Sequence, residues 1–209
     1  MAELNEVGVD ADAEKRRLAG LQSQIDSLTT DVNTAPMPMP RVLWRVLSVD
    51  VAASRALVIT RDIVAKKAYH VSIGRPTWAD CTLRRWLNTE FWSSLPASLQ
   101  ARVVEVTNHN NAGEETRDKV FLLDVTQARA LFENDADRVA RFGGDGCWWW
   151  LRSRGNFDYS AARVVGPGSV DRVGDVACLS CGGVRPALFI NLASGDPSHR
   201  AGGASQPDQ

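Results

Sequence analysis

An alternating proline run near residue 40 divides the chain into two unequal parts. Residues 36–40 read Pro-Met-Pro-Met-Pro, and each proline lacks a backbone donor and fixes its own φ. The run therefore cannot continue a helix, and we expect it to be an extended, semi-stiff linker. It leaves residues 41–192 for one globular domain, because a chain of 209 residues can bury one substantial core but not two.

Before the linker, within residues 1–35, the apolar residues follow a helical spacing. They alternate at intervals of three and four, which places them on one seam of a helix: Leu18, Leu21, Ile25, Leu28 and Val32. Fewer than three heptads make a weak coiled coil, so a helix that packs on its own domain is an equally good interpretation. We expect a short N-terminal helix that either forms a homo-oligomer through this seam or folds back.

Composition and charge narrow the classes of partner. The formal net charge of −1 gives no general attraction to nucleic acid or acidic membranes, so neither is an expected partner. The acidic, polar N-terminus and the lack of a long apolar run predict neither an export signal nor membrane insertion. We therefore expect a cytoplasmic protein or part of a phage particle. Residues 193–209 are rich in Gly, Ser, Pro and Ala, which is typical of disorder.

The first part of the domain alternates short strands and short helices. Runs of β-branched and aromatic residues predict strands at residues 42–47, 55–60, 103–106 and 119–124, with the first two forming a hairpin and a polar loop at 108–118. Helical spacing predicts helices from Thr77, from Pro96 to Ala101 and around 126–132. After Arg141 the composition changes, and only residues 184–192 again look like a conventional strand.

Residues 156–182 have little helix signal and poor strand alternation, but two core-like stretches flank them, at 148–153 and 183–188. The 156–182 segment mixes aromatic residues, both charge signs and glycines, as antibody contact loops do. An ordinary long loop would have the same appearance. The sequence thus raises the hypothesis of an irregular contact surface held at both ends.

The absence of five amino acids from the 156–182 segment favours the hypothesis of a contact surface. Lys, Gln, Glu, Met and Trp are absent from all 27 residues of the segment, although they supply 28 of the 209 residues of the chain. Chance absence at that background frequency is roughly 2%. These five are the amino acids that no codon ending in C encodes, so the segment looks like the product of Asn codons randomised at their adenines.

A fixed frame surrounds and interrupts the segment. Its most specific parts are Trp149-Trp150-Leu151-Arg152-Ser153 before and Gly183-Val184-Arg185-Pro186-Ala187-Leu188 after, with Ala161, Ala162, Val164, Gly168, Val170, Gly174 and Val176 between. With Trp78, Leu83-Arg84, Trp86-Leu87-Asn88 and residues 118–123, this frame resembles the variable proteins of diversity-generating retroelements. The resemblance covers roughly residues 41–192. One departure is Arg154, where the family more often has proline.

In that family, an error-prone reverse transcriptase rewrites adenines in the part of the gene that encodes the variable residues. The resemblance implies an α+β domain with the C-type lectin-like fold of the formylglycine-generating-enzyme type. It implies a hypervariable ligand-binding surface for an unidentified macromolecule, a protein or cell-surface molecule. The implied contact positions are Asn156, Phe157, Asp158, Tyr159, Ser160, Arg163, Val165, Pro167, Ser169, Asp171, Arg172, Val173, Asp175, Ala177, Cys178, Leu179, Ser180 and Cys181.

Enzymatic and metal chemistry have weaker support. The pair Cys178 and Cys181 forms a CxxC, but Cys81, Cys147 and the three histidines offer no second half-site at a ligand spacing, so we expect no metal and no cofactor. Formylglycine-generating oxidases share the fold and use a cysteine pair, yet here the pair lies among positions expected to vary. No carboxylate pair, Ser-His-Asp order or phosphate loop stands out, so we expect no catalytic residues.

Two alternatives to the binding hypothesis stay open. The chain could be a structural or assembly component of a phage particle, whose segment packs on a neighbour, and the oxidase is a more distant alternative. Within the frame, we expect the tryptophans at 148–150 to be core, and Arg152 and Arg185 to fix buried backbone through several donors rather than bind ligand.

Overall fold

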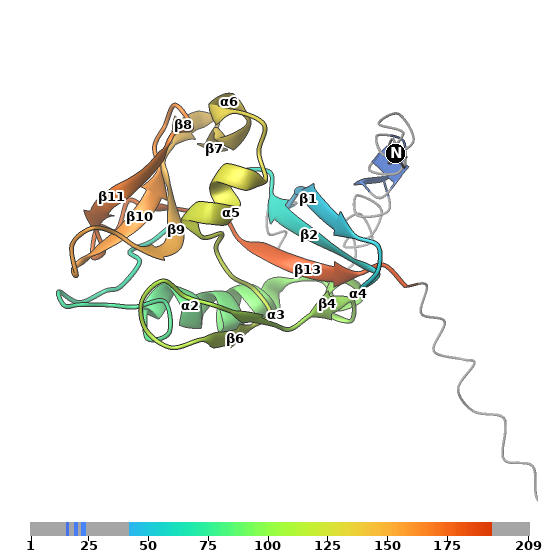
Figure 1. The fold of residues 1–209 in the computed structure, drawn as a ribbon, viewed down its shortest axis with the longest axis horizontal. Helices are drawn as coiled ribbons and strands as arrows, with labels where there is room; N and C mark the ends of the chain where they lie inside the picture. Colours follow the sequence, from blue (N-terminus) through green and yellow to red (C-terminus); the bar gives the residue numbers. More distant parts are fainter. Residues whose placement is uncertain (1–15, 17–18, 21, 24–41, 194–209) are drawn as a thin grey trace, which may run out of the picture.

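The computed structural model describes residues 16, 19–20, 22–23 and 42–193 (Figure 1). The proposed oligomerisation seam (Leu18, Leu21, Ile25, Leu28 and Val32), the 36–40 linker and the 194–209 tail lie outside the described residues. Residues 16, 19–20 and 22–23 are helical, and the side chain of Gln22 donates to the Trp44 carbonyl at 2.7 Å and accepts from the Val46 N–H at 3.1 Å. Across the described ranges, every helix is too short or too polar to span a membrane.

The first main sheet joins the start and the end of the domain. Strands β1 (Trp44–Asp50) and β2 (Arg55–Thr60) form the predicted antiparallel hairpin. Strand β13 (Ala187–Asn191) pairs antiparallel with β2 on its other side and is followed by β4 (Val103–Val104), so the order is β1-β2-β13-β4. Figure 1 shows β13 running beside β2. A late strand therefore completes a sheet that the first strands begin.

The second main sheet carries the 156–182 segment. Its order is β11 (Val170–Val176), β10 (Ser160–Val164), β9 (Trp149–Arg154), β12 (Gly183–Val184) and β3 (Ala65–Lys66). The pairs are antiparallel except for β9 with β12, which run parallel. The two strands that flank the segment, β9 and β12, are thus neighbours in one sheet and hold its ends together.

The expectation of an irregular segment was wrong, because 156–182 contains the β10–β11 hairpin. Strand alternation is weak there because β11 is irregular: a register shift between Ala161 and Arg163 interrupts the ladder. Strand β10 also pairs with the buried strand β9, and this pairing cannot be predicted from the local sequence.

Short helices and two small hairpins fill the remaining space. The helices are α2 (Thr82–Trp86), a π-helical turn η1 (Leu87–Phe91), α3 (Trp92–Ser94), α4 (Ala97–Gln100), α5 (Val125–Ala130) and α6 (Asp135–Arg138). The hairpins pair β5 (Val106–Asn108) with β6 (Thr116–Asp118) and β7 (Ala140–Phe142) with β8 (Asp145–Cys147). The described part is therefore a mixed α+β structure with several sheets and few, short helices.

Three predicted elements differ from the structure. The first helix begins at Thr82 rather than Thr77, because the Thr77 N–H and hydroxyl donate to the Asp80 carboxylate in a preceding turn. The predicted strand at 103–106 is divided between β4 and β5. Residues 120–123 of the predicted strand at 119–124 are buried, but the run forms an isolated bridge, Phe121 with Ala187, instead of a strand. An apolar run signals burial, but it does not reveal whether a strand partner exists.

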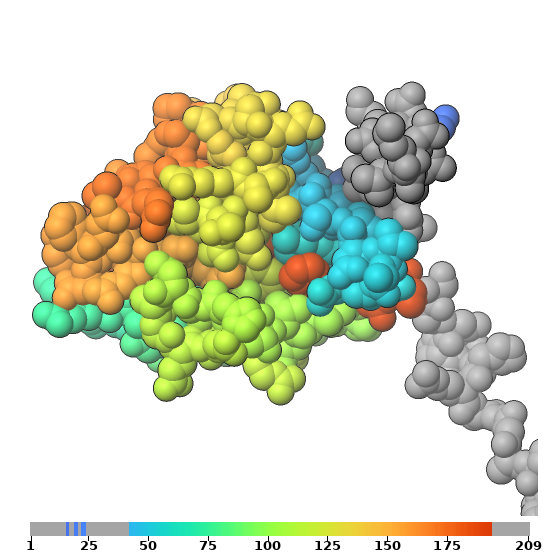
Figure 2. Space-filling model, in the orientation of Figure 1, coloured from blue at the N-terminus to red at the C-terminus, as the bar shows by residue number. Residues whose placement is uncertain are grey.

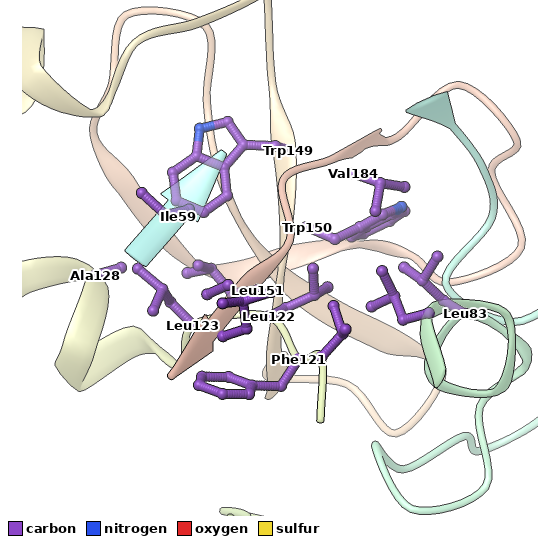
Figure 3. Packing of buried hydrophobic residues seen from close by; sticks show 14 of the residues in the cluster. Ile59, Leu83, Phe121, Leu122, Leu123, Ala128, Trp149, Trp150, Leu151 and Val184 are labelled. Atoms are coloured by element: carbon purple, nitrogen blue, oxygen red, sulfur yellow. The ribbon is translucent and has the colours of Figure 1, made fainter. Parts of the chain in front are cut away.

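The core lies where the second sheet meets the helices and β2 (Figure 3). Trp149 and Trp150 are fully buried, as predicted, whereas Trp148 is only half-buried. Leu151 and Leu122 lie close together in the same cluster, which Leu83 of α2 borders. The frame residues on either side of the 156–182 segment are therefore core residues.

Candidate functional site

A bulge shapes the β10–β11 hairpin. Ala161 pairs with Asp175 and Arg163 pairs with Asp171, so three residues of β11, 172–174, lie opposite Ala162 alone. Gly174 lies in this bulge at φ 77°, and a Cβ there would collide with the Ala161 carbonyl, so the position requires glycine. Arg172 and Val173, on the bulge, are exposed.

The residues expected to be fixed lie mostly inside. Ala161, Ala162 and Val164 of β10 are fully buried. Gly168 is buried at φ 98°, where any Cβ would strike the Asp135 carbonyl. Val176 is the exception, since its side chain is exposed. It lies on β11, which is the edge strand of the sheet among the residues that the structure describes.

The eighteen implied contact positions fall into three groups by burial. Nine are exposed: Asn156, Phe157, Tyr159, Pro167, Ser169, Arg172, Val173, Ser180 and Cys181. Seven are half-buried: Asp158, Arg163, Val165, Asp171, Asp175, Cys178 and Leu179. Two are buried, Ser160 and Ala177. The Ser160 hydroxyl accepts from the Phe157 N–H at 3.1 Å and donates to the Val173 carbonyl at 3.2 Å, so it holds the turn rather than facing a ligand.

Two aromatic residues form the most prominent exposed feature. The rings of Phe157 and Tyr159 stack with centroids 5.4 Å apart and planes within 7° of each other. Their side chains remain 52% and 43% exposed. Stacked, solvent-facing aromatic rings offer large apolar area at little cost in side-chain entropy, which suits a contact site.

Arg163 is held inside the hairpin. Its Nε lies 3.1 Å from Asp171 Oδ2, a second guanidinium nitrogen bonds Asp175, and the guanidinium lies over the Trp148 ring at 5.2 Å. Asp171 in turn accepts from the Val173 N–H at 2.9 Å. Arg163 therefore links the two strands across the bulge, and two of its guanidinium nitrogens are engaged within the protein.

A loop from early in the chain borders the segment, which the sequence did not reveal. Arg75 forms an ion pair with Asp158 at 2.6 Å, and the His70 N–H donates to the Ala177 carbonyl at 3.0 Å. In the same loop, Ile73 is 92% exposed and Val71 is also exposed. The loop extends at the same end of the molecule as β11 (Figure 2). Apolar residues in a Gly- and Pro-containing loop were the only sequence signal.

The two frame arginines fix buried backbone, as predicted. Arg152 donates to the Leu122 carbonyl at 3.0 Å and to the carboxylate of Asp124 at 2.6 Å. Arg185 donates to the carbonyls of Thr60, Arg61 and Arg138 at 2.8 to 3.2 Å. Burial lowers the pKa of Arg185 to about 10.

The four cysteines are free thiols that differ in environment. Cys81 is buried, and burial raises its pKa to about 12, while burial also raises the pKa of Cys147. Cys178 is half-buried and Cys181 is exposed. Within the described residues, His, Cys, Asp and Glu side chains form no group of three placed to hold a metal ion. His199 lies outside those residues.

Comparison with known proteins gives one match. A family model described as a domain of unknown function, DUF6273, matches residues 53–192. That stretch runs from the β1–β2 turn to the end of β13, so it includes the second main sheet and the whole 156–182 segment. Searches of curated proteins and of solved structures find no significant match. The chain belongs to the DUF6273 family.

Proposed function

We propose that the chain is a ligand-binding protein that presents a diversified surface on a C-type lectin-like domain, like the variable proteins of diversity-generating retroelements. One observation carries the proposal. In the 156–182 segment, Ala161, Ala162 and Val164, which the resemblance holds fixed, are fully buried, whereas Phe157 and Arg172, which it allows to vary, are exposed.

The anchoring of the segment supports this function. A diversified protein must fold with many different sequences on its contact surface, and substitutions at exposed positions typically change stability by no more than about 0.5 kcal/mol. Strands β9 and β12 pair at Gly183 and Trp149, so both ends of the segment are held by the core. Most of the exposed contact positions can be substituted without disturbing the pairing of β9 with β12.

The ligand that suits this surface is a macromolecule. An interface with a protein buries about 800 Å² on each partner, more than a few side chains provide. The stacked Phe157 and Tyr159 offer a central apolar contact, and the loop with Val71 and Ile73 extends the exposed apolar area beyond the segment. Aromatic residues of this kind supply much of the binding energy in protein interfaces.

Sibling genes should show concentrated variation. We expect substitutions at exposed positions such as Phe157, Tyr159 and Arg172, with Ala161, Ala162 and other buried frame residues unchanged. Nearby DNA should hold a near-copy of the codons for residues 148–188 that carries adenines where the two differ, beside a reverse transcriptase gene. Sequencing of sibling isolates checks this. An even spread of substitutions would instead favour a structural component of a phage particle.

The exposed contacts should be replaceable without loss of stability. A variant with Phe157→Ala, Tyr159→Ala and Arg172→Ala should keep its free energy of unfolding within about 1 kcal/mol, because these side chains face solvent. Arg163→Ala is the matched comparison from the same hairpin, and it should cost about 1–2 kcal/mol because Asp171 and Asp175 lose their shared partner. Urea denaturation measures both. Unfolding of the triple variant would show that the proposed surface is core.

A further inference from the structure

A cavity of about 470 Å³ lies beside the hairpin, where four segments of the chain meet. Helix α5 contributes Thr126 and Arg129, the end of β9 contributes Ser153 and Arg154, β11 contributes Arg172, and the 108–116 loop contributes Asn111. Helix α5 packs against both β9 and β11. The cavity is therefore built from elements that already contact one another.

The charged residues that line the cavity are all basic. Three arginines are among its lining residues, and none of these residues is acidic. Elsewhere in the domain, arginines next to the same strands have carboxylate partners, as Arg152 has in Asp124 and Arg163 has in Asp171. The side chains of Arg129, Arg154 and Arg172 make no ion pair or hydrogen bond with any residue that the structure describes. Their donors are available to a ligand.

The backbone that carries these arginines is well fixed. The Arg154 N–H donates to Asn111 Oδ1 at 2.9 Å, which ties the end of β9 to the loop. The Val125 N–H donates to the Ser153 hydroxyl at 3.1 Å, which ties α5 to β9. Arg129 and Arg154 are thus attached to elements that are bonded to one another, so binding an anion requires only the ordering of side chains.

We propose that this cavity binds a phosphate group, either inorganic phosphate or the phosphate of a monoester. Guanidinium groups match phosphate oxygens through paired N–H donors, and three of them from different elements can surround a tetrahedral dianion. A single planar carboxylate offers two oxygens in one plane and carries one charge, so it would leave part of the wall unneutralised.

This site goes beyond the proposed function and does not depend on it. Arg129 and Arg154 lie outside the 156–182 segment, and only Arg172 lies within it. Phosphate binding can be measured on the protein alone, whether or not sibling sequences vary. The two proposals therefore fail separately.

Calorimetric titration of the full chain with inorganic phosphate and with phenyl phosphate tests the site. Sodium acetate and sodium chloride at matched ionic strength serve as comparison anions. We expect saturable binding of at least one phosphate species, with a higher affinity for phenyl phosphate if the natural source is a monoester. Arg129→Gln and Arg154→Gln should each weaken binding about 10-fold, and the triple variant with Arg172→Gln should abolish it. Arg85→Gln removes an exposed charge outside the cavity and should leave the affinity unchanged.

Circular dichroism without phosphate establishes that each variant is folded. Should the triple variant unfold, Arg172→Gln alone, at an exposed position, provides the comparison with Arg85→Gln. Equal affinity for acetate, an effect that chloride reproduces, or unchanged phosphate binding by the folded arginine variants would overturn the proposal.

Discussion

Asp118→Ala is expected to lower the free energy of unfolding by about 3–5 kcal/mol, the largest effect of any single substitution considered for this protein. The buried carboxylate of Asp118 accepts from Trp78 Nε1 at 3.0 Å, Asn108 Nδ2 at 2.9 Å and the Thr116 hydroxyl at 2.7 Å. Its other oxygen pairs with Arg84 Nε at 2.6 Å. Alanine would leave these donors without their acceptor, in a region that excludes most water.

Urea denaturation measures the loss as a shift of the midpoint at an unchanged slope. Asp118→Asn keeps the shape and one acceptor oxygen, so its effect should be smaller than that of alanine. Glu105→Ala is the surface comparison, because Glu105 pairs with the largely exposed Arg117, and it should cost less than about 1 kcal/mol. A loss for Asp118→Ala no larger than that for Glu105→Ala would show that the four donors find other partners.

Arg185→Met is expected to cost about 2–4 kcal/mol, because the buried carbonyls of Thr60 and Arg138 and the part-buried carbonyl of Arg61 each lose a donor. The guanidinium also lies over the Trp149 ring at 5.1 Å. Methionine is apolar and of similar length, so it fills much of the space while removing every hydrogen bond. Urea denaturation of this variant therefore isolates the polar contribution of Arg185.

Arg185→Lys adds a test that depends on pH. Burial lowers the pKa of Arg185 to about 10, so arginine stays charged at neutral pH. Lysine starts from a pKa of about 10.4, and the same burial would lower it further. A base whose pKa is lowered in the folded state costs stability below that pKa, and this cost is lost as the pH rises from the lowered pKa toward about 10.4. The stability of Arg185→Lys, measured relative to wild-type protein at each pH, should therefore rise over this interval, and that of Arg85→Lys should not.

Local patterns predicted the elements whose stabilising contacts are also local. The β1–β2 hairpin follows from two apolar runs separated by a short turn. A helix was predicted around residues 126–132, and α5 lies there, where Asp124 caps it in a reciprocal arrangement with Gln127. The 119–124 run was predicted to be a strand because it is apolar. Whether such a run pairs with another strand depends on residues far along the chain, and here Phe121 alone bridges to β13.

The candidate surface was located by composition, but the role of each residue in it was not. Arg163 and Arg172 are the same residue type in the same segment. Arg163 pairs with Asp171 and links the two strands, whereas Arg172 is exposed. Arg154 stood out in the sequence as a departure from the family, which more often has proline there. In the structure it lines the cavity with Arg129. Both distinctions depend on register and on contacts between distant segments, which a single sequence does not encode locally.

The place of β13 in the first sheet affects how this domain folds during synthesis. Strand β2 is translated early, but its inner neighbour is β13, and Ile59 pairs with Ala187. The ribosome must therefore finish the 156–182 segment before that sheet can close. Pairing between strands this far apart in the sequence also makes folding slow. Closure of the first sheet therefore waits for the last strand of the domain, and a chain released before β13 is complete would leave β2 without this neighbour.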